Sequence, residues 1–402
     1  MKQTARILST YSADTFGVCS ALYELGGMVV IHDPSGCNST YTTHDEPRWF
    51  SEPSQIFVSA LTEQDAILGN DAKLIADIEA AAKELQPRFI CLIPSQIAHM
   101  IATDCRAICH ILEKKTGIPA FTLPTNSMHY YERGIYFALQ KLADFACQSL
   151  PEPGAVPEPV PAASWLSEEK LEQLCQAKGA PLHVNVLGAT PLDFAMNGSI
   201  DSIRHWLEKR GCRVTSCWVM GSDLDAILAS HRADLNLVVS YGGLGAARVL
   251  RERAGIPYLV GLPFPQLQPI DTPSNALAGR PAYIIGETVF AGSLACALEA
   301  ALGLPRAAIT TIVPMETDSE RAPAARHALP DGRVRAHASP AQGRPHHRRP
   351  ALRAHLPNER RLRLAAAHRL LRPTLREAHP QSHRSALLCR IRAKNPAHTP
   401  AE

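Results

Sequence analysis

Cys19 and Cys37 are the two residues whose type and spacing most directly suggest chemistry. They flank an apolar run that ends in His32-Asp33-Pro34-Ser35-Gly36. Two such thiols could ligate an iron–sulfur cluster, form a disulfide or fill space in a core. The spacing C-x17-C fits no short zinc or ferredoxin pattern, so spacing by itself leaves all three interpretations open.

The elements around these cysteines suggest where they lie. Met28–His32 is predicted to be a buried strand, and Pro34–Gly36 a tight turn that presents Cys37 at its carboxyl end. Cys19 is predicted to begin a short helix. In an open parallel sheet, ligands collect at the carboxyl ends of the strands. Gly36, which has no Cβ, lets the backbone approach a bulky group.

Residues 1–150 alternate strand and helix patterns, which predicts a first α/β domain with a parallel sheet. The expected strands are Met28–His32, Ser54–Val58, Arg88–Ile93 and Ala120–Leu123. The expected helices are Asn70–Leu85, Thr103–Lys115 and Gly134–Cys147. The fold class is therefore α/β, with repeated Rossmann-like parallel-sheet domains and helices on both faces.

Residues 151–180 are predicted to be a proline-rich linker followed by a short helix at Ser164–Gln176. Residues 181–320 are predicted to form a second Rossmann-like α/β domain. Its expected strands are His183–Leu187, Arg213–Trp218, Leu235–Val239, Pro257–Val260 and Ala282–Ile285. Its expected helices are Ser199–Arg210, Ser222–His231, Gly245–Ala254 and Val289–Leu302.

Several of these strands run into loops rich in glycine and serine, which we expect to line one crevice and bind a ligand. The residues are Gly188, Thr190, Ser240, Gly242, Gly243, Gly286 and Glu287. None of the loops is a complete dinucleotide fingerprint or a Walker loop. The Gly242-Gly243-x-Gly245 pattern is more typical of a close helix–strand contact.

Bulk composition predicts a cytoplasmic protein of two to three domains. The chain has 402 residues, 46% of them hydrophobic, and no apolar run long enough for a membrane span. Its N-terminus lacks the apolar stretch of a secretory signal, so the 11 cysteines indicate a reducing compartment.

Residues 321–402 have a different character from the rest of the chain. They contain 17 Arg and nine His but no Phe, Tyr, Trp or Met. A nucleic-acid-binding arm and a disordered tail are two interpretations. We favour a third, in which an out-of-frame reading has replaced a lost or scrambled C-terminal portion. Resequencing the 3′ end and finding an intact frame would exclude it.

Four segments in order resemble the nitrogenase component 1 family, over roughly residues 15–315. They are His32–Cys37, Leu61–Asn70, Ala254–Tyr258 and Ile284–Glu287. The family includes nitrogenase catalytic subunits, cofactor-assembly scaffolds, and reductases of chlorophyll and methanogenic-cofactor biosynthesis. The chain resembles the short nitrogenase-like members, not a true dinitrogenase, because Ala247 stands where nitrogenase has a cofactor cysteine.

This resemblance implies an iron–sulfur cluster of the [4Fe-4S] type, held by one subunit or shared between two. Cys19 and Cys37 become metal ligands by the resemblance. Cys91 lies near the place of a third family cysteine, although Ser95 or Gln96 is the alternative occupant. Asp33 stands where the family has glycine, and is either an oxygen ligand or a turn residue.

The resemblance also implies a function and partners. The chain would be an oxidoreductase subunit that accepts electrons from an ATP-dependent, nitrogenase reductase-like iron protein and reduces a bound substrate. Its second partner would be another component 1-type subunit, identical or different, with no membrane and no nucleic acid involved. A metallocluster assembly scaffold and a metal-free α/β small-molecule-binding protein are the alternatives.

Two further groups of polar residues have competing interpretations. Cys105 and Cys109, with His99 and His110 nearby, could form a zinc site, but packing is favoured. The run from His44 to Arg48 is expected to be either a solvated turn or a contact with a docking partner.

Overall fold

The computed structural model describes residues 12–36, 38, 46–49, 55–151, 164–194, 198–263, 282–302, 309–312 and 362–363. Contacts divide the chain into two compact units, Thr10–Gly261 and a second unit that includes Leu262–Glu402. The segment His44–Asp45 and most of the predicted linker and basic tail lie outside the described residues.

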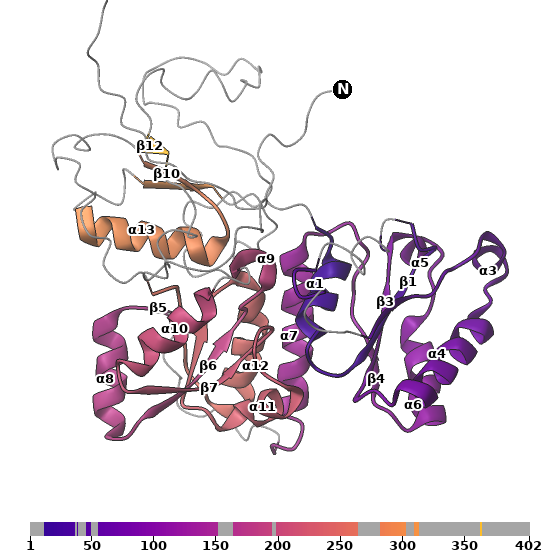
Figure 1. The fold of residues 1–402 in the computed structure, drawn as a ribbon, viewed down its shortest axis with the longest axis horizontal. Coiled ribbons are helices and arrows are strands. Elements are labelled where there is room, and N and C mark those ends of the chain that lie inside the picture. Colours follow the sequence, from indigo (N-terminus) through magenta and orange to yellow (C-terminus); the bar gives the residue numbers. More distant parts are fainter. Residues whose placement is uncertain are drawn as a thin grey trace, which may run out of the picture. The chain divides into compact units, whose positions relative to one another are not determined.

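The first half of the unit Thr10–Gly261 is a parallel four-stranded sheet with the strand order β2-β1-β3-β4 (Figure 1). The strands are β1 (Met28–His32), β2 (Ile56–Val58), β3 (Ile90–Pro94) and β4 (Ala120–Thr122). The helices are α1 (Asp14–Leu22), α3 (Glu63–Leu68), α4 (Asp71–Leu85), α5 (Gln96–Met100), α6 (Cys105–Thr116) and α7 (Tyr131–Ala146). Each predicted strand is present, with ends shifted by a few residues.

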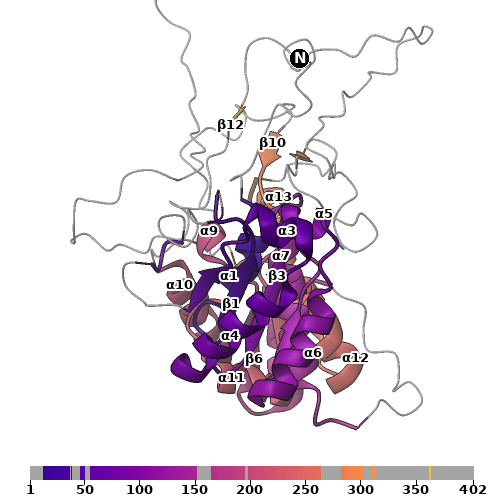
Figure 2. The same cartoon turned by 90° about the vertical axis from the view of Figure 1, so that its right-hand side faces the viewer.

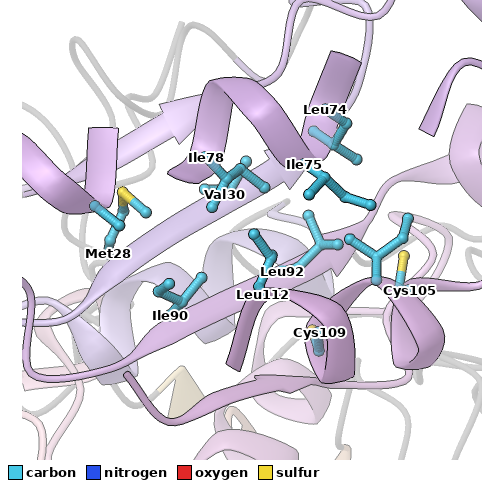
Figure 3. Close-up of a cluster of buried hydrophobic side chains, with 12 residues drawn as sticks. Met28, Val30, Leu74, Ile75, Ile78, Ile90, Leu92, Cys105, Cys109 and Leu112 are labelled. Carbon is cyan, nitrogen blue, oxygen red and sulfur yellow. The ribbon is translucent and has the colours of Figure 1, made fainter. Parts of the chain in front are cut away.

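One face of this sheet is covered by α4 and α6, which face the viewer in Figure 2. Alternate strand residues point to this face because the side-chain period of a strand is two. They form a core with the apolar faces of the two helices (Figure 3). The labelled members are Met28, Val30, Leu74, Ile75, Ile78, Ile90, Leu92, Cys105, Cys109 and Leu112. Cys105 and Cys109 therefore pack in the core.

The opposite face of the first sheet is covered by α1 and α7. Phe121 of β4 contacts Phe145 of α7 edge to face, with ring centroids 5.2 Å apart. Cys19 lies in the middle of α1 and not at its beginning, because the helix starts earlier, at Asp14. The Asp14 carboxylate accepts hydrogen bonds from the backbone of Thr15 and Ser127, which ties the start of α1 to the loop before α7.

The second half of this unit is a parallel five-stranded sheet with the order β5-β9-β8-β6-β7. The strands are β5 (Ser164–Trp165), β6 (Leu182–Leu187), β7 (Cys212–Cys217), β8 (Leu235–Val238) and β9 (Tyr258–Val260). The helices are α8 (Glu168–Lys178), α9 (Pro191–Phe194), α10 (Ser199–Glu208), α11 (Leu224–Leu228), η2 (Ala229–Arg232), η3 (Tyr241–Gly243) and α12 (Leu244–Ala254). Strand β5 was expected as the start of a helix.

Helix α7 joins the two halves, because it packs against α1 on one side and against η3 and α12 on the other (Figure 1). Glycines make both contacts close. A Cβ added at Gly17 would lie 2.0 Å from the Tyr131 carbonyl oxygen, and one at Gly242 would lie 2.4 Å from Ile135. The glycines therefore let α7 pack closely against α1 within the first half and against η3 of the second half.

The unit that begins at Leu262 contains a third sheet, with the parallel order β11-β10-β12. Its elements are β10 (Ala282–Ile285), α13 (Thr288–Leu302), β11 (Ile309–Ile312) and β12 (Leu362–Arg363). Ala282–Ile285 is a strand as expected, but it pairs with β11 and β12 and not within the second sheet. Two residues of the basic tail thus pair with a predicted strand.

Candidate functional site

The carboxyl edge of the first sheet brings together the ends of three strands. His32, the last residue of β1, is opposite Pro94 at the end of β3. The His32 Nδ1 atom lies 2.8 Å from Ser59 Oγ, just after β2, and the Ser95 amide donates to the His32 carbonyl at 3.3 Å. Burial lowers the pKa of His32 despite nearby carboxylates, so this ring is neutral at pH 7 and can donate through one nitrogen only.

Hydrogen bonds from the segment after β2 hold the start of the loop that leaves β1. The Leu61 amide donates to the Asp33 carbonyl at 2.9 Å, and the Asp33 amide donates to Ser59 Oγ at 3.2 Å. Ser35 has a φ of 90°, a left-handed conformation that a non-glycine residue rarely adopts. A Cβ added at Gly36 would meet no atom of the described residues within 4 Å. A left-handed backbone at a non-glycine residue such as Ser35 is typical of a functional loop.

Ser95 supplies a second unusual group at this edge. Its side chain is 1% exposed, and its hydroxyl has no hydrogen-bond partner among the described residues. A buried hydroxyl without a partner costs free energy. This hydroxyl, next to the end of β1, is therefore available to a ligand. Ser95 is one of the two residues that the sequence offered in place of Cys91.

Of the three thiols that were predicted as cluster ligands, the structure describes two, and both are buried. Cys19 in α1 and Cys91 in β3 are both completely buried, and burial raises the pKa of each thiol above its ordinary value. Cys91 is the second residue of β3, before Pro94 at its end, and does not reach the sheet edge. Cys37 lies outside the described residues. Within the described part of the chain, no three His, Cys, Asp or Glu side chains form a group that could hold a metal ion.

The described residues at this edge offer a histidine whose pKa is lowered and a serine hydroxyl without a described partner. The two described thiols lie in the core, where burial raises their pKa. A cluster requires thiolates. The described residues thus do not provide the ligand set, and Cys37 is the remaining thiol at this loop.

The predicted ligand-binding residues of the second sheet make hydrogen bonds and close contacts within the chain. Ser240 Oγ donates to the Gly188 carbonyl at 2.6 Å, and Thr190 Oγ1 donates to Asp193 at 2.6 Å. A Cβ at Gly243 would lie 2.5 Å from the Leu187 carbonyl oxygen. Gly188, Gly242 and Gly243 therefore serve close packing of η3 against β6 and α7, and a ligand-binding role stays a prediction.

Gly286 and Glu287 lie in the other unit, before α13. A Glu287 carboxylate oxygen accepts hydrogen bonds from the amides of Val289 and Phe290, at 2.8 and 2.9 Å. Glu287 thus satisfies amides at the start of a helix. This role accounts for its position without a ligand.

Arg48, which the sequence analysis considered for a docking contact, is buried instead. Its side chain is fully buried, although a solvated turn or a docking contact was expected. Nε donates to Glu46 at 2.7 Å, Nη1 donates to Glu24 and to the Val219 carbonyl, both at 2.8 Å, and Nη2 donates to the Ser20 carbonyl at 2.8 Å. Arg48 thus joins the two halves of the unit.

A family model described as nitrogenase component 1 type oxidoreductase matches residues 15–271, more than half of the sequence. The chain belongs to this family. Within the described residues, no helix is long and apolar enough to cross a membrane.

Two kinds of family member are among the proteins similar to this chain. The nitrogenase iron-molybdenum cofactor biosynthesis protein NifE of Clostridium pasteurianum is 27% identical over 64% of this chain and 51% of its own length. A light-independent protochlorophyllide reductase protein of Prosthecochloris aestuarii is 25% identical over 58% of this chain and 39% of its own length. The chain thus spans about half or less of the length of these relatives.

The fold is that of nitrogenase component 1 structures. A solved structure titled nitrogenase Cp1 at pH 5 superposes with a TM-score of 0.51 at 16% identity, covering 78% of this chain and 66% of that one. A second, at pH 6.5, also has a TM-score of 0.51 and covers 79% of this chain and 63% of the other. The predicted family and fold class are confirmed.

Proposed function

We propose that this chain is one subunit of a nitrogenase-like two-component reductase, with its redox group held at the carboxyl edge of the first sheet. The observation that carries the proposal is the construction of that edge: the left-handed backbone at Ser35 lies in the loop after β1, and the buried Ser95 hydroxyl has no hydrogen-bond partner among the described residues. Membership of an oxidoreductase family supports it.

The same edge exposes apolar side chains that favour a partner subunit. They follow the carboxyl ends of β2, β3 and β4: Ile67, Leu68, Met100, Ile101 and Met128. Helix α3 buries none of its residues, although Thr62 and Asp65 form a capping box at its start. An element that is stabilised locally but leaves Leu68 80% exposed is typical of a docking surface. We assign this surface to a second component 1-type subunit.

The ligand from this chain is proposed to be Cys37, with the Ser95 hydroxyl and the His32 ring close to the group. Cys19 and Cys91 stay predicted ligands, but to bind a cluster as a thiolate either of them would have to leave its present core environment. An iron–sulfur cluster supplies one-electron transfer at low potential when bound. The chain's own residues position the loop: Ser59 holds His32 and the Asp33 amide, and Leu61 holds the Asp33 carbonyl.

The reducing electrons are proposed to come from a separate iron protein that hydrolyses ATP. The sequence of this chain has no Walker loop, which fits that division of work. The substrate site is proposed to lie at the carboxyl edge of the second sheet, near Gly188 and Ser240.

A cofactor-assembly scaffold is the second candidate, since three of the similar proteins are named as cofactor biosynthesis proteins. The two candidates differ in whether the bound cluster stays on this chain or is passed to another protein.

The experiment mixes anaerobic protein with a nitrogenase-type iron protein and MgATP, and follows the absorbance of the cluster. The reductase proposal predicts ATP-dependent bleaching with iron retained. Iron that moves to an apo acceptor without bleaching would favour the scaffold, and no ATP-dependent change together with no transfer would contradict both.

A further inference from the structure

Cys175 and Cys212 bring two thiols together from distant parts of the sequence. Cys175 lies on α8 and Cys212 begins β7, and their Sγ atoms are 3.7 Å apart. A disulfide needs an S–S distance of about 2.05 Å, so the two sulfur atoms have to approach each other for the bond to form. We propose that Cys175 and Cys212 form a reversible disulfide, in which Cys175 is the first thiol to react with an oxidant.

The two thiols differ in access, which gives the site an order of events. Cys175 is partly exposed, whereas Cys212 is 5% exposed. Burial and then the neighbouring Cys175 raise the pKa of Cys212 to about 12. Since thiolates are the attacking species, Cys175 reacts first with an oxidant in solution, and Cys212 acts as the resolving thiol.

The reaction is a thiol–disulfide exchange with a low-molecular-weight disulfide such as glutathione disulfide. The Cys175 sulfur attacks one glutathione sulfur, the glutathione S–S bond breaks, and one glutathione leaves as a thiol. The Cys212 sulfur then attacks the Cys175 sulfur and displaces the second glutathione. The two cysteines lose two electrons and two protons, and the two glutathione thiols gain them.

The disulfide would fix a helix that the core holds weakly. Leu171 is the one buried residue of α8. Ion pairs hold the two ends of the helix: Arg210 to Glu168 at 2.6 Å, and Lys178 to Asp234. Such pairs contribute little in water. A covalent bond from the middle of α8 to β7 closes the chain between residues 175 and 212 and thereby stabilises the second sheet.

Other thiol neighbours in the described chain lack this combination. Cys105 and Cys109 lie near each other on α6, but both are buried in the core of the first sheet. Cys217, at the other end of β7, is 1% exposed. These thiols are protected from a solution oxidant, whereas the pair at α8 has one partner that solvent can reach.

The test is oxidation of the full chain with glutathione disulfide, followed by tryptic mapping without reduction. Trypsin cleaves after Lys170 and Lys178 and on both sides of Gly211–Arg213, so the cross-link joins peptides 171–178 and 211–213. We expect this linked peptide in the wild type, its disappearance on reduction with a dithiol, and a higher melting temperature in the oxidised form.

Two variants and a control make the result decisive. Cys175→Ser should give neither the cross-link nor an adduct on residue 212, whereas Cys212→Ser should keep one glutathione on Cys175. Cys296→Ser, which changes another partly exposed cysteine, should form the cross-link as the wild type does. A stable glutathione adduct on Cys175 in the wild type, or a bond from Cys175 to a different cysteine, would overturn the proposal. The proposal does not depend on the proposed function.

Discussion

The fully buried Arg48 pairs with the partly buried Glu24, with Nη1 2.8 Å from Oε1, and both side chains also bind the segment after β7. The Arg48 guanidinium donates to the Val219 carbonyl, and the other Glu24 oxygen accepts from the Gly221 amide, each at 2.8 Å. Burial disfavours the charge of Arg48, but its bonds to Glu46 and Glu24 outweigh burial and raise its pKa. The two halves of the unit are thus joined by a charge network as well as by helix α7.

Arg48→Met should destabilise the protein by about 3–5 kcal/mol, because it removes the buried cation that pairs with the Glu46 and Glu24 carboxylates. The free energy of unfolding from denaturant titration measures this. Arg88→Met is the matched control: Arg88 also bridges the halves, to Asp225 at 2.7 Å, but both side chains are at least half exposed. Equal effects of the two variants would contradict a structural role for the buried network.

Gly134→Ala should destabilise the protein by about 3 kcal/mol, because overpacking here meets backbone and not a movable side chain. An added Cβ would lie 1.8 Å from the Asp14 carbonyl oxygen, so α1 and α7 would have to separate. Gly36→Ala, where the added Cβ meets no atom of the described residues within 4 Å, should leave the melting temperature unchanged. If both variants melt like the wild type, the close crossing of α1 and α7 is wrong.

Much of this fold follows from the apolar pattern of the sequence, because the run Met28–His32 is buried at every position and the helix Asp71–Leu85 buries residues at helical spacing. What periodicity does not encode is the partner of each strand. The apolar pattern of Ala282–Ile285 predicts a strand but does not say which sheet the strand joins. Its pairing with Ile309–Ile312 depends on contacts outside the segment.

The candidate site was harder to predict than the fold. The loop His32–Gly36 is visible in the sequence because proline and glycine mark the turn after a strand. The burial of Arg48 is not visible, since it depends on Glu24 and Val219, which are distant in the sequence. The Ser95 hydroxyl was anticipated only as an alternative to Cys91, because a strand end cannot be placed to the residue by apolar pattern.

Asp234→Asn should cost about 1 kcal/mol at pH 7, since the carboxylate joins Lys178 to the backbone of His183 at a partly exposed position. Burial raises the pKa of Asp234, but these bonds outweigh it and the pKa is lowered. A lowered folded-state pKa gives stability that is present above the unfolded value of about 3.9 and is lost as pH falls through the folded value.

The difference in melting temperature between wild type and Asp234→Asn should therefore shrink as the pH is lowered from 5 toward 3. A difference that stays constant over this range would show that the charge of Asp234 does not contribute.

Leu68→Glu should weaken association of the chain with a second component 1-type subunit, because it places a charge in the exposed apolar surface of α3. Sedimentation velocity of wild type and variant measures the association. Ile111→Glu is the control: Ile111 is 39% exposed on α6, away from the carboxyl edge. Weakening by Ile111→Glu but not by Leu68→Glu would place the docking surface elsewhere.

The central claim is most directly tested by the iron and acid-labile sulfide content of anaerobically purified protein, beside Cys37→Ala. A four-iron cluster shared by two subunits predicts about two iron atoms per chain, lost in Cys37→Ala. Cys19→Ala and Cys91→Ala, measured in parallel, show whether either core thiol is also a ligand. Absence of iron from the wild type, or iron content unchanged by Cys37→Ala, would contradict a redox group at the carboxyl edge of the first sheet.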